Sequence, residues 1–145
     1  MEHSEILNIL FDLNSYYWAI FQHQFRAEKK KAEAAGAPFN KLTFEEILEM
    51  IISQVIFNVS SSQKNQFNFY IFDENDCHLI YPLNKFDTAY VKMMNFNKIR
   101  ETINERILAF LENKELTATK NSKIIKALSK ALCRMNKFKA ENKLV

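Results

Sequence analysis

The feature that most restricts the fold of this chain is a nearly continuous apolar run, Ile6–Phe11, which ends at Asp12. A strand that faces water on one side alternates apolar and polar residues, whereas a continuous run suits a strand buried on both faces. Strands of that kind occur in parallel sheets that helices cover on each side. The first segment therefore predicts an α/β domain with a layered core.

Two helical patterns follow this strand. Residues from about Trp18 to Ala35 have helical periodicity, which Gly36 and Pro38 then break. The next helix has Thr43 as its N-cap and Glu46 three residues later, in capping-box position, and it should run to about Asn58. Its apolar positions recur at helical spacing and are Phe44, Ile47, Leu48, Ile51, Ile52, Val55 and Ile56.

The middle of the chain predicts an antiparallel hairpin. Two extended runs, Phe67–Phe72 and Cys77–Tyr81, flank the acidic and amide residues 73–76, which are typical of turns. Pro82 stops the second strand and favours an edge position for it.

Two more helices are expected in the second half, while residues 85–94 are irregular and give no assignment. The first of these helices starts at Asn95 or Asn97, and the second runs from about Ser122 to Asn136. The final residues, 143–145, read as the start of another strand. The inward stripes of the two helices are Ile99, Ile103, Ile107, Phe110 and Leu111, and Ile124, Ile125, Leu128, Leu132 and Met135.

This order of elements predicts a doubly wound α/β sheet, mostly parallel, with an antiparallel hairpin at its edge. Residues 1–145 are expected to form a single domain. Only three strands are complete, and a sheet covered on two faces usually has more. We therefore expect an incomplete domain that stops before its last strands.

Composition excludes several kinds of function. Gly36 is the only glycine, and loops that cradle phosphates need several glycines, so nucleotide-binding enzymes are excluded. Cys77 and Cys133 lie outside any metal-ligand spacing and are expected to be two buried thiols, with a single disulfide as the alternative. The chain lacks both a bilayer-length apolar stretch and a basic n-region at its amino terminus, which favours an intracellular protein without a membrane partner.

The turn after the first strand is a candidate metal site of weak quality. Residues 12–16 occupy the position of the Asp-x-Ser-x-Ser loop of von Willebrand factor A domains, with Asn14 and Tyr16 in place of the two serines. Mg²⁺ needs several small oxygen ligands, and a tyrosine is too long to supply one here. We interpret Asp12 as a residue that caps the turn by accepting backbone N–H bonds, and we expect no bound metal or other cofactor.

Three segments together resemble the small von Willebrand A-like core subunit of general transcription factor IIH. They are Leu7–Trp18, Leu79–Pro82 and Leu128–Lys137, and they occur in that family's order. The family has an Asp-x-Asn-Pro-x-x-Trp turn after its first strand, where this chain has Ser15 in place of the proline. Its carboxy-terminal zinc module would lie beyond Val145.

The resemblance implies a von Willebrand A-like fold and a nuclear, non-catalytic scaffold. Such a subunit pairs with the larger, RING-bearing von Willebrand A-like subunit and with other core subunits, in transcription initiation and nucleotide excision repair. The alternative is a metal-dependent, adhesion-like protein-binding module of the same fold. Titration with Mg²⁺ that depends on Asp12 would separate the two.

The residues give candidates for partner binding but none for catalysis. The histidines are scattered, no nucleophile lies in a recognisable elbow, and Glu45, Glu46 and Glu49 form a solvated helix face. Residues 1–113 carry a net charge of −4 (11 basic, 15 acidic) and residues 114–145 a net charge of +7 (9 basic, 2 acidic). The last helix could thus meet an acidic partner or nucleic acid, although a solvated face explains it as well. The candidates are Tyr16, Tyr17, Lys123, Lys126, Lys130 and Arg134.

Overall fold

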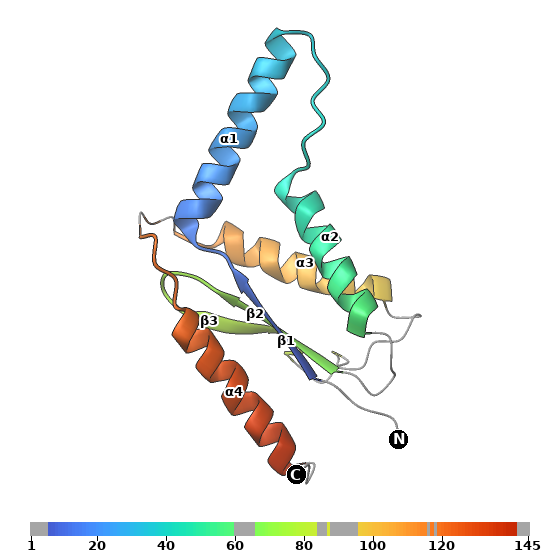
Figure 1. Cartoon of the computed structure of the whole chain (residues 1–145), viewed down its shortest axis with the longest axis vertical. Coiled ribbons are helices and arrows are strands. Elements are labelled where there is room, and N and C mark those ends of the chain that lie inside the picture. The colour runs from blue at the N-terminus through green and yellow to red at the C-terminus, as the bar shows by residue number, and fades with distance from the viewer. Residues whose placement is uncertain are drawn as a thin grey trace.

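The computed structural model describes residues 6–59, 66–83, 87, 96–115, 117 and 119–141. The predicted order of elements is confirmed within these ranges, whereas the strand start predicted at 143–145 lies outside them. The elements are β1 (Ile6–Asp12), α1 (Ser15–Ala34), α2 (Phe44–Val59), β2 (Gln66–Phe72), β3 (Cys77–Tyr81), α3 (Phe96–Glu112) and α4 (Ile124–Glu141) (Figure 1).

The described strands form a small mixed sheet in the order β1-β2-β3. β1 runs parallel to β2, in a register that pairs Ile6 with Gln66 and Asp12 with Phe72. β3 is antiparallel to β2 and lies at an edge, as Pro82 predicts. One parallel and one antiparallel pair make this sheet mixed, whereas a mostly parallel sheet was expected.

The central strand is β2, and its two faces supply two separate parts of the core. Phe67, Phe69 and Ile71 point to one face, and Tyr70 and Phe72 point to the other. All five side chains are at most 4% exposed. Burial on both faces, which the sequence predicts for β1, is thus most complete in β2, because β1 lies at the other edge of the described sheet and its residues are mostly half-buried.

Helices α2 and α3 cover the first of these faces. The apolar stripes predicted for both helices reach the core, although Ile51 of α2 remains 38% exposed. In α3 the first three stripe positions are at most 3% exposed. The fully packed residues are Leu48, Ile52 and Ile56 of α2 and Ile99, Ile103 and Ile107 of α3.

Helix α4 covers the opposite face, and here the predicted orientation is wrong. Ala127 and Ala131 pack against the sheet, whereas four of the five apolar positions expected to face inward are exposed and Met135 is half-buried. Alanines let the helix backbone lie close to the strands, so the larger apolar side chains point past the sheet. The exposed positions, which we call the α4 stripe, are Ile124, Ile125, Leu128 and Leu132, with exposures between 45% and 74%.

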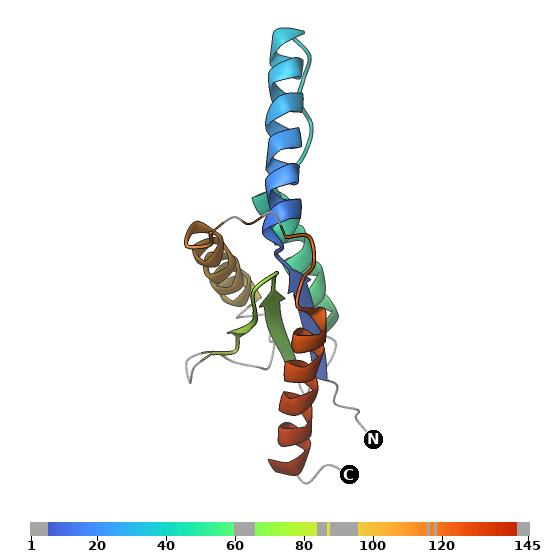
Figure 2. The same ribbon diagram turned by 90° about the vertical axis from the view of Figure 1, so that its left-hand side faces the viewer.

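Helix α1 projects away from the sheet, and the segment 35–43 runs back along it to the start of α2 (Figures 1 and 2). The helix begins at Ser15, three residues before the predicted start, because Asn14 acts as its N-cap. Gly36, with φ +65°, ends the helix in the left-handed conformation that glycine adopts at little cost.

Among the described residues, no helix is both long enough and apolar enough to span a membrane. Cys77 is buried as expected, but Cys133 on α4 is exposed, which corrects the prediction of two buried thiols. Its exposure follows from the orientation of α4, because Cys133 lies two residues after the buried Ala131 and therefore on nearly the opposite side of the helix.

Candidate functional site

The candidate site lies at the carboxyl ends of the parallel strands β1 and β2. Ligands of α/β proteins commonly bind at this end of parallel strands. Asp12 Oδ1 accepts the backbone N–H of Asn14 at 3.0 Å and the Ser122 hydroxyl at 2.8 Å. Asn14 Oδ1 in turn accepts the backbone N–H of Tyr16 at 2.9 Å. The interpretation of Asp12 as a cap for its turn is therefore confirmed.

A buried polar cluster, which we call the Lys114 cluster, lies next to this turn. It consists of Ser15, Asp73, Glu74, Lys114 and Thr117. The side chains of Asp73, Glu74 and Lys114 are only 2–4% exposed. The first two belong to the turn between β2 and β3, and Lys114 follows α3. The fold thus brings together charges from segments about forty residues apart in the sequence.

Glu74 is held as a carboxylate by the groups around it. Its Oε1 accepts the hydroxyls of Ser15 at 2.6 Å and Thr117 at 2.9 Å, and its Oε2 accepts the backbone N–H of Ser15 at 3.0 Å. Burial alone would raise its pKa, but these hydrogen bonds, together with one from its own backbone, lower the pKa to about 2. Glu74 is consequently charged at neutral pH and fastens the first turn of α1 to the β2–β3 turn.

The Lys114 ammonium completes the cluster. Its Nζ donates to the carbonyl oxygen of Leu13 at 2.6 Å, and lies 2.9 Å from Asp73 Oδ2 and 3.2 Å from Glu74 Oε2. An ammonium has three N–H donors, and these three acceptors use all of them. The other oxygen of Asp73 accepts the backbone N–H groups of Asn75 and Asp76. Each charged group of the cluster therefore has hydrogen-bonded partners, which hold it in place between α1, the β2–β3 turn and the end of α3.

Metal-binding geometry is absent from the described part of the chain, where no three His, Cys, Asp or Glu side chains gather in a suitable group. The three residues of the weak candidate metal site make different contacts and do not converge on one point. Asp12 and Asn14 cap the turn, and the Tyr16 ring lies under the Lys120 ammonium, 4.9 Å from the ring centroid. Sequence reasoning missed Glu74 and Lys114, although a Glu in a turn after a buried strand was a possible signal.

The predicted partner-binding tyrosines lie at the start of α1. Tyr17 is 55% exposed and meets Tyr16 edge to face, with ring centroids 5.4 Å apart. Tyr16 is half-buried. Tyr17 is thus the more accessible of the two, as a contact with another protein requires.

Most of the predicted basic residues contact β2, β3 or the turn between them. Lys126 Nζ is 2.8 Å from Asp76 Oδ1, and Lys130 Nζ donates to the carbonyl oxygen of Cys77 at 2.5 Å. Arg134 Nε donates to Asn68 Oδ1 at 3.0 Å. The hydrogen bond from Lys126 is the main reason why the pKa of Asp76 lies well below its ordinary value. These three basic side chains therefore contact other parts of the protein and do not form a purely solvated face.

Lys123 differs from the other three. Lys123 is exposed, and its side chain makes no ion pair with the described residues. Its backbone N–H donates to the carbonyl oxygen of Asp73 at 2.8 Å. Lys123 and Tyr17 are consequently the predicted partner-binding residues that remain most available.

Comparisons with known proteins give one family and one fold. The family model described as transcription factor Tfb4 matches residues 4–144. A crystal structure of the TFIIH p34 N-terminal domain superposes with a TM-score of 0.67 at 20% sequence identity, and the match covers 97% of this chain. The chain spans 60% of the length of that solved chain. Among curated proteins, none matches.

Proposed function

Because the chain belongs to the transcription factor Tfb4 family, we propose that it serves as a non-catalytic scaffold subunit of TFIIH. The observation that carries this proposal is the family match over residues 4–144, nearly the whole chain. The Lys114 cluster supports it, because its charged groups are used in holding elements together. The proposed roles are transcription initiation and nucleotide excision repair, in the nucleus.

We propose that the fold is a doubly wound, von Willebrand A-like sheet that continues beyond β1. Two features support this view. β1 forms the edge of the described sheet although its sequence is almost entirely apolar, and Leu7 is 42% exposed. The α4 stripe lies on a helix that also contacts β1, and further strands beside β1 would cover it. Residues 1–145 would then be one part of a larger domain, with a zinc module farther along the protein.

The Lys114 cluster also supports a function that needs no metal ion at this edge of the sheet. The Lys114 ammonium supplies a positive charge to the carboxylates that a cation would otherwise neutralise. Titration of the protein with Mg²⁺ or Mn²⁺, followed by Trp18 fluorescence, should therefore show no saturable change. A saturable change that is lost in Asp12→Ala would instead favour the adhesion-like alternative.

The proposed partner is the larger, RING-bearing von Willebrand A-like subunit of the complex, along with other core subunits. Tyr17 and Lys123 are the candidates for the contact, since both are exposed at the same end of the described sheet as the Lys114 cluster. Exposed aromatic and basic side chains are common anchors at protein interfaces.

Co-purification from cells that express both full-length proteins tests this pairing. The tagged larger subunit should retain the wild-type protein and the variant Lys30→Ala, which changes an exposed lysine on α1. The double variant Tyr17→Ala/Lys123→Ala should be retained at least about tenfold less, as expected from the loss of two interface anchors. Failure of the wild-type protein to co-purify would refute the pairing, and equal retention of the double variant would place the interface elsewhere.

A further inference from the structure

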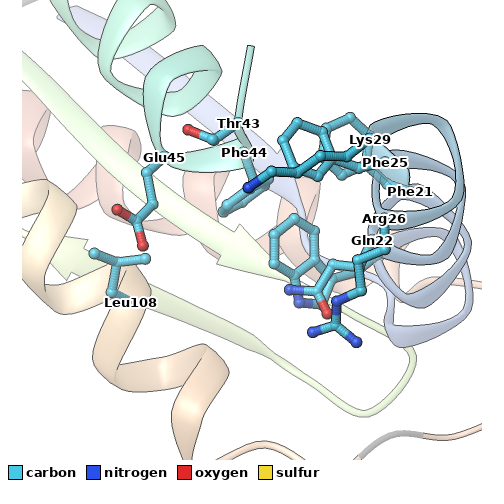
Figure 3. A pocket seen from close by; sticks show the side chains of 10 residues that line it. Phe21, Gln22, Phe25, Arg26, Lys29, Thr43, Phe44, Glu45 and Leu108 are labelled. Carbon is cyan, nitrogen blue, oxygen red and sulfur yellow. The ribbon is translucent and has the colours of Figure 1, made fainter. Parts of the chain in front are cut away.

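A cleft opens between α1 and the start of α2 (Figure 3), and none of the residues of the Lys114 cluster lines it. Its volume is about 410 Å³, within the range of roughly 300–1,000 Å³ that is usual for ligand pockets. The aromatic rings of Trp18, Phe21, Phe25 and Phe44 line it, and Arg26 and Lys29 of α1 border it. The cleft is therefore apolar inside with cations along one rim.

The aromatic lining is held in place by contacts between the rings. The centroids of Trp18 and Phe44 are 3.7 Å apart, and Trp18 stacks on Phe21 at 5.9 Å with an interplanar angle of 9°. Phe21 stacks on Phe25 at 6.4 Å. All four residues are half-buried. Three of them belong to α1, which projects from the body of the molecule, whereas Phe44 is the first residue of α2. Such a row of ordered aromatic rings around a hollow is typical of sites that bind an apolar anchor.

The charges around the cleft differ between its two sides. Arg26 and Lys29 are exposed, and neither forms an ion pair with any described residue. The nearby carboxylate of Glu28 pairs with Lys41 instead. On the opposite side, Glu45 lies beside Leu108 (Figure 3). The α1 side of the cleft therefore favours anions, and the α2 side disfavours them.

We propose that this cleft binds an acidic peptide segment of a partner protein, with a bulky apolar side chain inserted among the aromatic rings. The carboxylates of the segment lie on the α1 side, where they pair with Arg26 and Lys29. This site is separate from the proposed contact at Tyr17 and Lys123 and does not depend on it.

A single-stranded nucleic acid would also seek cations and aromatic rings, but the geometry favours a peptide. A base needs an exposed ring face on which to stack. Here Phe44 packs closely on Trp18, with ring centroids 3.7 Å apart, so the Trp18 ring is partly covered by a neighbouring ring.

Fluorescence anisotropy with a labelled probe peptide tests the proposal. The probe is Asp-Glu-Asp-Phe-Glu-Glu-Leu-Asp, and two further peptides carry Ser in place of Phe and Leu, or Lys in place of every acidic residue. The protein is the full chain, as wild type and as Arg26→Glu/Lys29→Glu. The matched control is Lys30→Glu/Lys31→Glu, which changes the net charge equally on the same helix outside the lining of the cleft. Thermal unfolding verifies that all three proteins are folded.

The proposal expects saturable binding of the probe, on the order of tenfold weaker for Arg26→Glu/Lys29→Glu and within about twofold of wild type for the control. Both altered peptides should bind at least about tenfold more weakly than the probe. No saturable binding, equal losses in the two charge variants, undiminished binding of the Ser peptide, or tighter binding of a labelled oligothymidine would each overturn it. None of these results bears on co-purification with the larger subunit.

Discussion

Replacing Lys114 with Met removes the ammonium on which the Lys114 cluster depends. The substitution keeps most of the length and apolar volume of the side chain, so the main change is the loss of one positive charge. It leaves the carboxylates of Asp73 and Glu74 without their shared counterion, in surroundings where both side chains are at most 4% exposed. It also leaves the carbonyl oxygen of Leu13 without its donor.

The magnitude follows from this burial. Breaking a buried ion pair by removing one partner costs about 3–5 kcal/mol, because the remaining charge has no compensation. We therefore expect the free energy of unfolding at pH 7 to fall by about 4 kcal/mol. A loss of that size is a large share of the roughly 5–15 kcal/mol that holds an ordinary domain together.

Urea unfolding followed by circular dichroism measures this loss. The control is Lys30→Met on the exposed side of α1, for which a change within about 0.5 kcal/mol is expected. A second variant, Glu74→Gln combined with Lys114→Met, removes two of the three charges of the cluster. It should cost less than the two single substitutions together, by about 1–3 kcal/mol. A loss below about 1 kcal/mol for Lys114→Met, the value typical of an exposed ion pair, would refute the assignment of a buried cluster.

Three further predictions concern other parts of the structure. Because the folded-state pKa of Glu74 lies below its ordinary value, the stabilisation by its carboxylate is present above about pH 4.5 and is lost as the pH falls toward 2. Urea titrations should show that wild type loses about 2 kcal/mol more than Glu74→Gln over this range, which is the scale of hydrogen bonds to one charge. Equal losses would contradict the role of Glu74. On α4, Ala131→Leu should destabilise the protein by about 1–3 kcal/mol through overpacking against the sheet, whereas Leu128→Ser should change its stability by less than about 1 kcal/mol. Thermal melts that give the reverse order would mean that the α4 stripe faces inward. Iodoacetamide should label exposed Cys133 in the folded protein but not Cys77, whose thiol is buried and has a pKa raised mainly by that burial. Mass spectrometry that finds Cys77 labelled first would contradict the packing of α4 on β3.

Local patterns predicted the elements well because their signals depend on neighbours in the sequence. The capping box at Thr43 and Glu46 forms as expected, with Glu46 N–H donating to the Thr43 hydroxyl at 3.2 Å. The hairpin and the stripe of α3 were also identified in this way. The start of α1 was missed, because the bulky residues after Asn14 concealed an ordinary N-cap.

The candidate site shows where such reasoning stops. Asp12 could be interpreted correctly from its place at a strand end, since its partner Asn14 is two residues away. Glu74 and Lys114 could not be connected, because a contact across forty residues leaves no local pattern. The cleft beside α1 likewise depends on how the segment 35–43 returns along the helix, which no periodicity encodes.

The amino-acid sequence by itself determined that this is an α/β chain of the Tfb4 family, with its helices, hairpin and turn caps in order. These properties arise from interactions between residues a few positions apart. Only the tertiary structure decided which side of α4 meets the sheet. An apolar stripe in a sequence indicates that one face of the helix is buried, but it does not indicate which other element buries it. In α4 the small volume of Ala127 and Ala131 set the contact, and the larger side chains of the α4 stripe remained exposed.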